Sequence, residues 1–127
     1  MTSPMLTAVV RELPALPEQI ADAVRPYIGN GTILEVATAV ESADPNSYRE
    51  AVAAWRTPLR LLLILDPDSE STATRAYADW GHWIAGGGLL ALRNADDLHR
   101  RILLGGKYRD LATVGPVRIL QRLAACN

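Results

Sequence analysis

The segment that most constrains the fold is the apolar run from Leu59 to Leu65, which is followed at once by Asp66-Pro67-Asp68. A short run of this kind is typical of a strand that is covered on both faces, as parallel strands in α/β proteins are. Open α/β sheets bind ligands at the carboxyl ends of such strands. The two aspartates therefore mark the place where we expect a functional site.

Two further strands are expected around this one, at Thr32–Ala37 and Leu89–Arg93. Apolar residues at helical spacing predict a helix over Ser47–Trp55, and another, capped by Ser69 or Ser71, over Ala73–Ile84. Strand, helix and strand in this order form right-handed crossovers, so these three strands are expected to be parallel.

In the chain after residue 85, glycines mark two boundaries between the expected elements. Gly86-Gly87-Gly88 is interpreted as the terminator of the preceding helix, and Asn94-Ala95-Asp96 as the amino cap of a short helix through Leu103. The strands Tyr108–Val114 and Val117–Leu123 are joined only by Gly115-Pro116, which requires an antiparallel pair. Across the sheet, the expected order is first, central, third, last and penultimate strand.

The amino-terminal segment, residues 1–30, is expected to be helical and to pack on the sheet. Met5–Leu13 and Pro17–Ile28 both carry apolar residues at helical spacing. The strand Thr32–Ala37 would then be an edge, and it has no proline or lysine to discourage pairing. The amino-terminal helices could cover this edge, or a second copy or another protein chain could pair there. We therefore expect a homodimer or a complex with a partner.

Composition narrows the class of protein. The 127 residues predict one domain, and the net charge of −1 gives no positive patch for nucleic acid or an anionic membrane. The single cysteine, Cys126, cannot form an intrachain disulfide, and we expect no catalytic role for it. No leader or membrane-length apolar run is evident, so a cytoplasmic protein is expected.

The stretch from Leu59 to Leu92 resembles a known family. Its apolar strand, Asp-x-Asp, helix containing Trp80, and Gly-Gly-Gly-Leu-Leu-Ala-Leu are similar to the second half of class I S-adenosylmethionine-dependent methyltransferases, above all the small-molecule O-methyltransferases. The final strand pair, Tyr108–Leu123, is similar to the pair that closes that fold. The resemblance implies an α/β, reduced Rossmann-like methyltransferase fold, with a mostly parallel sheet and a C-terminal antiparallel pair.

The sequence departs from this family at its working residues. Ala37–Glu41 contains no glycine, although the family has a glycine-rich turn against the cofactor at this point. Only Thr38–Pro58 separates the first and central strands, which is too short for the family's second and third strands. Ser69 replaces a histidine and Asn94 an acidic residue. These changes argue against ordinary methyl transfer.

Asp66 is the first candidate for a catalytic carboxylate. The resemblance also implies that Asp66 and Glu41 contact the cofactor, which would be S-adenosylmethionine if one binds; a surface role for Glu41 is the alternative. Asp66, Asp68 and Asn94 form the candidate metal site, since hard cations prefer oxygen ligands. The alternative is that Asp66 orients the following helix and Asp68 is solvated.

Aromatic and basic residues give weaker candidates. His82, Trp80 and Trp83 could stack on a ligand or supply a general base. They are expected at the opposite end of the sheet from the aspartates, which favours packing or a subunit contact. His99, followed by Arg100-Arg101, is interpreted as a solvated helix face, with an anion site as the alternative.

The leading hypothesis is a degenerate methyltransferase-like protein of small-molecule, and perhaps secondary, metabolism that acts as an oligomerising or auxiliary subunit without normal methyl transfer of its own. One alternative is an enzyme with a retained pocket at the strand carboxyl ends. It would be an S-adenosylmethionine-dependent O-methyltransferase or a non-methylating cyclase or isomerase. The other alternative is a ligand-binding module without turnover.

Overall fold

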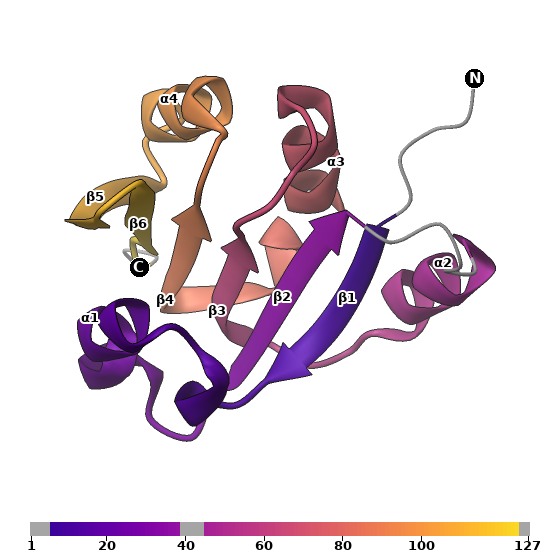
Figure 1. The fold of residues 1–127 in the computed structure, drawn as a ribbon, viewed down its shortest axis with the longest axis horizontal. Coiled ribbons are helices and arrows are strands. Elements are labelled where there is room, and N and C mark those ends of the chain that lie inside the picture. Colours follow the sequence, from indigo (N-terminus) through magenta and orange to yellow (C-terminus); the bar gives the residue numbers. More distant parts are fainter. Residues whose placement is uncertain (1–5, 39–44, 125–127) are drawn as a thin grey trace.

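The computed structural model describes residues 6–38 and 45–124, shown in Figure 1. These residues form six strands, four α-helices and two short 3-10 helices. In order they are β1 (Leu6–Arg11), η1 (Leu13–Ala15), α1 (Glu18–Ile28), β2 (Thr32–Thr38), α2 (Pro45–Ala54), β3 (Leu59–Ile64), α3 (Glu70–Trp80), η2 (Gly81–Trp83), β4 (Ile84–Leu92), α4 (Asp96–Leu104), β5 (Tyr108–Val114) and β6 (Val117–Arg122).

All six strands form one sheet in the order β1-β2-β3-β4-β6-β5. The five strands that were expected, β2 to β6, have the neighbours that were expected. The prediction of a mostly parallel, Rossmann-like methyltransferase sheet is wrong. Only β2 with β3 and β3 with β4 pair in parallel, while the other three pairings are antiparallel. The physical reason is that only α2 and α3 form crossover connections, whereas the strands at both ends of the sheet reach their neighbours by reversing direction.

The helix expected over Met5–Leu13 is also wrong, because β1 occupies most of that stretch. Two adjacent valines, Val9 and Val10, favour extended backbone, and β2 offers a free edge with which β1 makes an unshifted antiparallel register from Leu6 opposite Thr38 to Arg11 opposite Ile33. Strand β2 is therefore an inner strand, and the exposed edge predicted for it has moved one strand outward, to β1.

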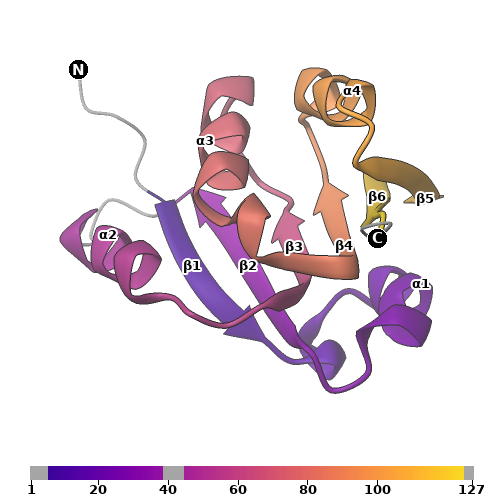
Figure 2. The ribbon, with the colours of Figure 1, turned by 180° about the vertical axis from the view of Figure 1, so that it is seen from behind.

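Helices cover the two faces of the sheet unequally (Figures 1 and 2). Helices α2, α3 and α4 pack on one face, and α1 alone packs on the other. The strand β3 is buried on both faces, as its sequence predicted. No helix in the described parts of the chain is long and apolar enough to cross a membrane.

Trp80 is the centre of the three-helix face and is fully buried. Its ring makes edge contacts with Trp55 and Tyr48 at centroid distances of 5.3 and 6.1 Å. Its indole N–H donates to the Tyr48 hydroxyl at 2.9 Å, and that hydroxyl donates to Asp79 at 2.7 Å. Burial, reinforced by the bond to Asp79, raises the pKa of Tyr48 above its ordinary value.

The glycine run Gly86–Gly88 lies inside β4, so its interpretation as a helix terminator is wrong. Helix α3 ends earlier, at Trp80. The register of β3 against β4 shifts where these glycines lie, and Gly87 has a positive φ of 82°. A Cβ on Gly88 would lie 2.8 Å from the Ala85 carbonyl oxygen. The glycine run therefore allows the backbone of β4 to bend at a bulge.

Candidate functional site

The carboxyl ends of β2, β3 and β4 meet at one edge of the sheet, as the crossover argument predicted. Thr38, at the end of β2, connects this strand to the loop that follows β3. Its hydroxyl donates to the Asp66 carbonyl oxygen at 3.3 Å and accepts from the Asp68 backbone N–H at 3.2 Å. The loop that carries both candidate aspartates is thus fixed to the neighbouring strand through backbone groups.

Asp66 is paired with Arg93, which follows the last residue of β4. The guanidinium Nη2 lies 2.5 Å from Oδ1 of Asp66, and Nε of the same arginine donates to the Leu65 carbonyl oxygen at 2.8 Å. The cation therefore lies beside the carboxylate that was proposed as a metal ligand. A neighbouring positive charge disfavours the binding of a metal cation there.

Asp68 is engaged in the start of α3. Its Oδ1 accepts a hydrogen bond from the Thr72 hydroxyl, and the Ser69 hydroxyl accepts from the Thr72 backbone N–H at 3.2 Å. Ser69 is thus the helix N-cap, one of the two serines that the sequence suggested. Asp68 adds a negative charge at the same positive helix end, which is a structural role.

Asn94 turns the chain between β4 and α4 with a left-handed backbone, φ 59°. In the described chain no hydrogen bond links its side chain to Asp66 or Asp68, and no group of three or more His, Cys, Asp or Glu residues is placed to hold a metal ion. The third residue of the candidate metal site is therefore not tied to the other two. Glu41, the other proposed cofactor contact, lies outside the described residues.

Glu70 is a site-edge residue that sequence reasoning missed. Its carboxylate, in the first turn of α3, accepts from the backbone N–H groups of Asp97 and Leu98 at 3.1 and 3.3 Å. It therefore caps α4 from a different helix, whereas the cap was expected within Asn94-Ala95-Asp96; the N-cap residue itself, Ala95, makes no side-chain bond. Only the tertiary structure brings the two helix starts together.

The remaining candidates separate into packing and exposed residues. Trp80 belongs to the core, whereas His82 is exposed and its ring contacts that of Trp83 at 5.3 Å. His82 and Trp83 precede β4 and so lie at the amino end of the parallel strands, opposite Asp66, as predicted.

His99 is not the solvated residue that was expected. It is nearly buried, and its Nε2 lies 2.7 Å from Oδ1 of Asp110 on β5. The pair joins α4 to the edge strand.

No protein-family model matches this sequence. The assignment of a function therefore depends on the contacts described above.

Proposed function

We propose that this chain is an auxiliary subunit that assembles with a second copy of itself through the free edge of β1, and that it performs no methyl transfer of its own. The observation that supports this proposal is a difference between the two outer strands of the sheet, β1 and β5. They differ in how far they are protected against pairing with another chain.

Strand β1 is the unprotected edge. Val9 and Val10 are 42% and 57% exposed, and the strand contains neither proline nor lysine. Its only charged residue, Arg11, lies at its end and pairs with Glu35 of β2 at 2.9 Å. In the part of the chain that the structure describes, no strand pairs with the outer side of β1, and an edge strand with exposed valines is a template for a further strand.

Strand β5, at the other edge, is protected. It carries two charges, Arg109 and Asp110, and its register against β6 shifts between Asp110 and Ala112. Charges and bulges are the features by which edge strands avoid pairing. The contrast between the two edges favours β1 as the assembly surface.

A second copy of this chain fits the edge by symmetry. In a two-fold antiparallel pairing centred on Val9, Val9 lies opposite its own copy, Val10 lies opposite Ala8, and Arg11 lies opposite Thr7. No like charges face each other across such a pair, and the two sheets would join into one. The small apolar and β-branched residues in the middle of the strand would meet at the axis.

The edge of the sheet that carries Asp66 bears on the enzyme alternatives. Both carboxylates there already have partners inside the chain, Arg93 and Thr72. This supports a subunit role over the enzyme alternatives, and we place that role in the cytoplasm and in small-molecule metabolism.

The test is the mass in solution together with a designed edge variant. We expect a dimer for the unchanged chain, and a monomer with unchanged circular dichroism for Val10→Lys, because an exposed lysine at the centre of the edge opposes pairing. Thr113→Lys, which adds the same charge to the exposed side of β5, is the matched control and should remain a dimer. A monomeric parent chain, or a dimeric Val10→Lys variant, would contradict assembly through β1.

The second half of the proposal is tested by titrating S-adenosylmethionine and S-adenosylhomocysteine into the protein by calorimetry. We expect no heat of binding. Micromolar affinity, which corresponds to about −8 kcal/mol, would instead restore the enzyme hypothesis.

A further inference from the structure

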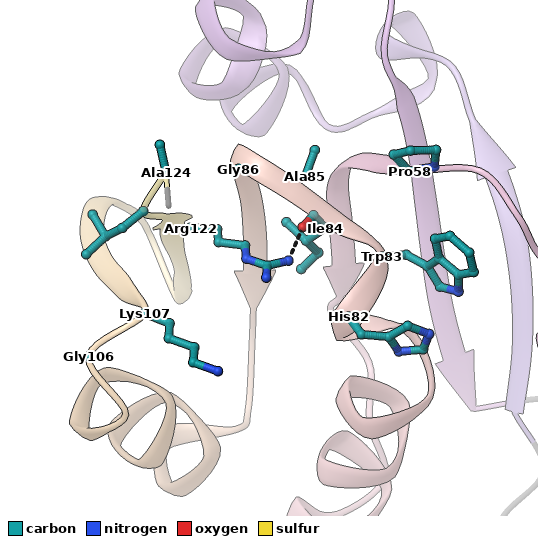
Figure 3. A pocket seen from close by; sticks show the side chains of 11 residues that line it. Pro58, His82, Trp83, Ile84, Ala85, Gly86, Gly106, Lys107, Arg122 and Ala124 are labelled. Carbon is teal, nitrogen blue, oxygen red and sulfur yellow. Dashed lines mark hydrogen bonds between the residues drawn. The ribbon is translucent and has the colours of Figure 1, made fainter. Parts of the chain in front are cut away.

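A cavity of about 720 Å³ lies at the end of the sheet opposite Asp66. It is bounded by η2 and the first residues of β4, by the loop between α4 and β5, and by the end of β6 (Figure 3). Its volume is in the range of small-molecule sites. The residues that line it are Pro58, His82, Trp83, Ile84, Ala85, Gly86, Gly106, Lys107, Arg122, Leu123 and Ala124.

The charge of this lining is one-sided. Lys107 and Arg122 are cations, the third polar side chain is that of His82, and no aspartate or glutamate is among the lining residues. A second cavity of about 300 Å³ is lined by the same three residues and also has no acidic residue. Because cavity walls of low dielectric concentrate the field of like charges, this region attracts anions.

Lys107 is available to a ligand. It is exposed, and its side chain makes no hydrogen bond or ion pair with any residue in the described part of the chain. In Figure 3 its side chain extends from the α4–β5 loop into the cavity. Arg101, which lines a neighbouring cavity, is by contrast paired with Asp97 at 3.2 Å. Lys107 is also the only lysine of the chain, so it can be observed selectively.

Arg122 is the second cation of the lining. Its Nη1 donates to the Ile84 carbonyl oxygen, which holds the guanidinium at the cavity wall (Figure 3). A guanidinium has five N–H donors, so this bond leaves others for an anion. A guanidinium held in place binds carboxylate or phosphate in a defined orientation, while the flexible ammonium adds charge.

The other wall of the cavity carries two aromatic rings and a proline. Pro58, Trp83 and His82 line the side opposite Lys107 in Figure 3. The indole of Trp83 is only partly buried, and it offers a surface for an aromatic or flat apolar group. Positive charge on one wall and an aromatic surface on the other suit a ligand that has an anionic group and a flat apolar body.

We infer that this cavity binds a small molecule that carries a carboxylate or phosphate on an aromatic body, with Lys107 and Arg122 holding the anion and Trp83 contacting the ring. The inference is independent of assembly through β1, since none of these residues belongs to that strand.

The experiment titrates 1-naphthyl phosphate, 1-naphthoate and uncharged 1-naphthol into the full chain by calorimetry. At least one anion should bind tenfold more tightly than naphthol, and the tighter of the two identifies the preferred anionic group. Lys107→Gln should weaken that anion about tenfold, or about 1.4 kcal/mol. Arg100→Gln removes an exposed charge that does not line the cavity, and it should change the affinity less than twofold.

A second measurement locates the contact. Reductive methylation with ¹³C-formaldehyde labels Lys107 as the single lysine, and its resonance should move when the bound anion is added. Equal affinity for naphthol and both anions, no binding of either anion, or binding unchanged by Lys107→Gln would overturn the inference.

Discussion

The replacement Tyr48→Phe tests how the buried Trp80 is held. The change keeps the ring that contacts the indole edge at 6.1 Å and removes only the hydroxyl. That hydroxyl is the acceptor for the indole N–H at 2.9 Å and the donor to Asp79 at 2.7 Å. Because Trp80 is completely buried, no water replaces the lost acceptor.

The expected loss of stability follows from these two bonds. A buried donor left without a partner costs about 1–3 kcal/mol, and a hydrogen bond to a charged group contributes about 1.5–3 kcal/mol. Asp79 is only half-buried, so water replaces part of the stabilisation from its hydrogen bond with Tyr48. We therefore expect Tyr48→Phe to lower the free energy of unfolding by about 2–3 kcal/mol.

The assay is urea unfolding followed by circular dichroism, and the slope against denaturant should be unchanged because the native fold is kept. Asp79→Ala is the matched comparison. It removes the carboxylate but leaves the Tyr48 hydroxyl to accept from Trp80, and should cost about 1 kcal/mol. If Tyr48→Phe costs less than about 0.5 kcal/mol, or less than Asp79→Ala, the indole N–H does not depend on this acceptor and the argument fails.

Three further predictions concern pH, packing and the candidate site. Burial, the largest cause in each case, raises the pKa of Tyr48 and Tyr108. The unfolded chain therefore ionises these phenols above about pH 10 while the native state does not, so the free energy of unfolding should fall there by up to about 1.4 kcal/mol per pH unit for each tyrosine. Chemical unfolding at a series of alkaline pH values measures this slope, and Tyr48→Phe should reduce it. Gly31→Ala should destabilise the protein by about 1–3 kcal/mol in urea, because its Cβ would lie 1.7 Å from Cγ of Arg60. Asp66→Asn should change stability by less than about 1 kcal/mol by thermal unfolding, since its side chain is 67% exposed; a larger loss would show that its pairing is structural.

Local signals in the sequence identified the central elements. The apolar run of β3, the helical spacing of α1, α2 and α3, and the Ser69 cap are properties of neighbouring residues, which the sequence states directly. The closing hairpin was also evident, because Gly115, with φ 57°, takes a conformation that glycine favours.

The amino-terminal strand could not be recognised in this way. Leu6 to Arg11 has apolar residues that suit either a helix or a strand, and the choice is made by β2, which supplies hydrogen-bond partners far along the chain. The same strand changes the proportion of parallel pairs and moves the free edge. Gly86–Gly88 was misinterpreted for a related reason, since a glycine run marks a break in regular structure without telling a helix end from a strand bulge.

The residues of the candidate site were also predictable only in part. The sequence alone determined that two aspartates follow a buried strand, and that the strand ends meet at one edge, because both follow from residue order and crossover handedness. Only the tertiary structure decided that Arg93 lies against Asp66 and that Thr72 bonds Asp68. It also decided that Lys107 and Arg122, which no motif connects, line one cavity with Trp83. Such contacts depend on how separate elements pack, and local spacing carries no record of that packing.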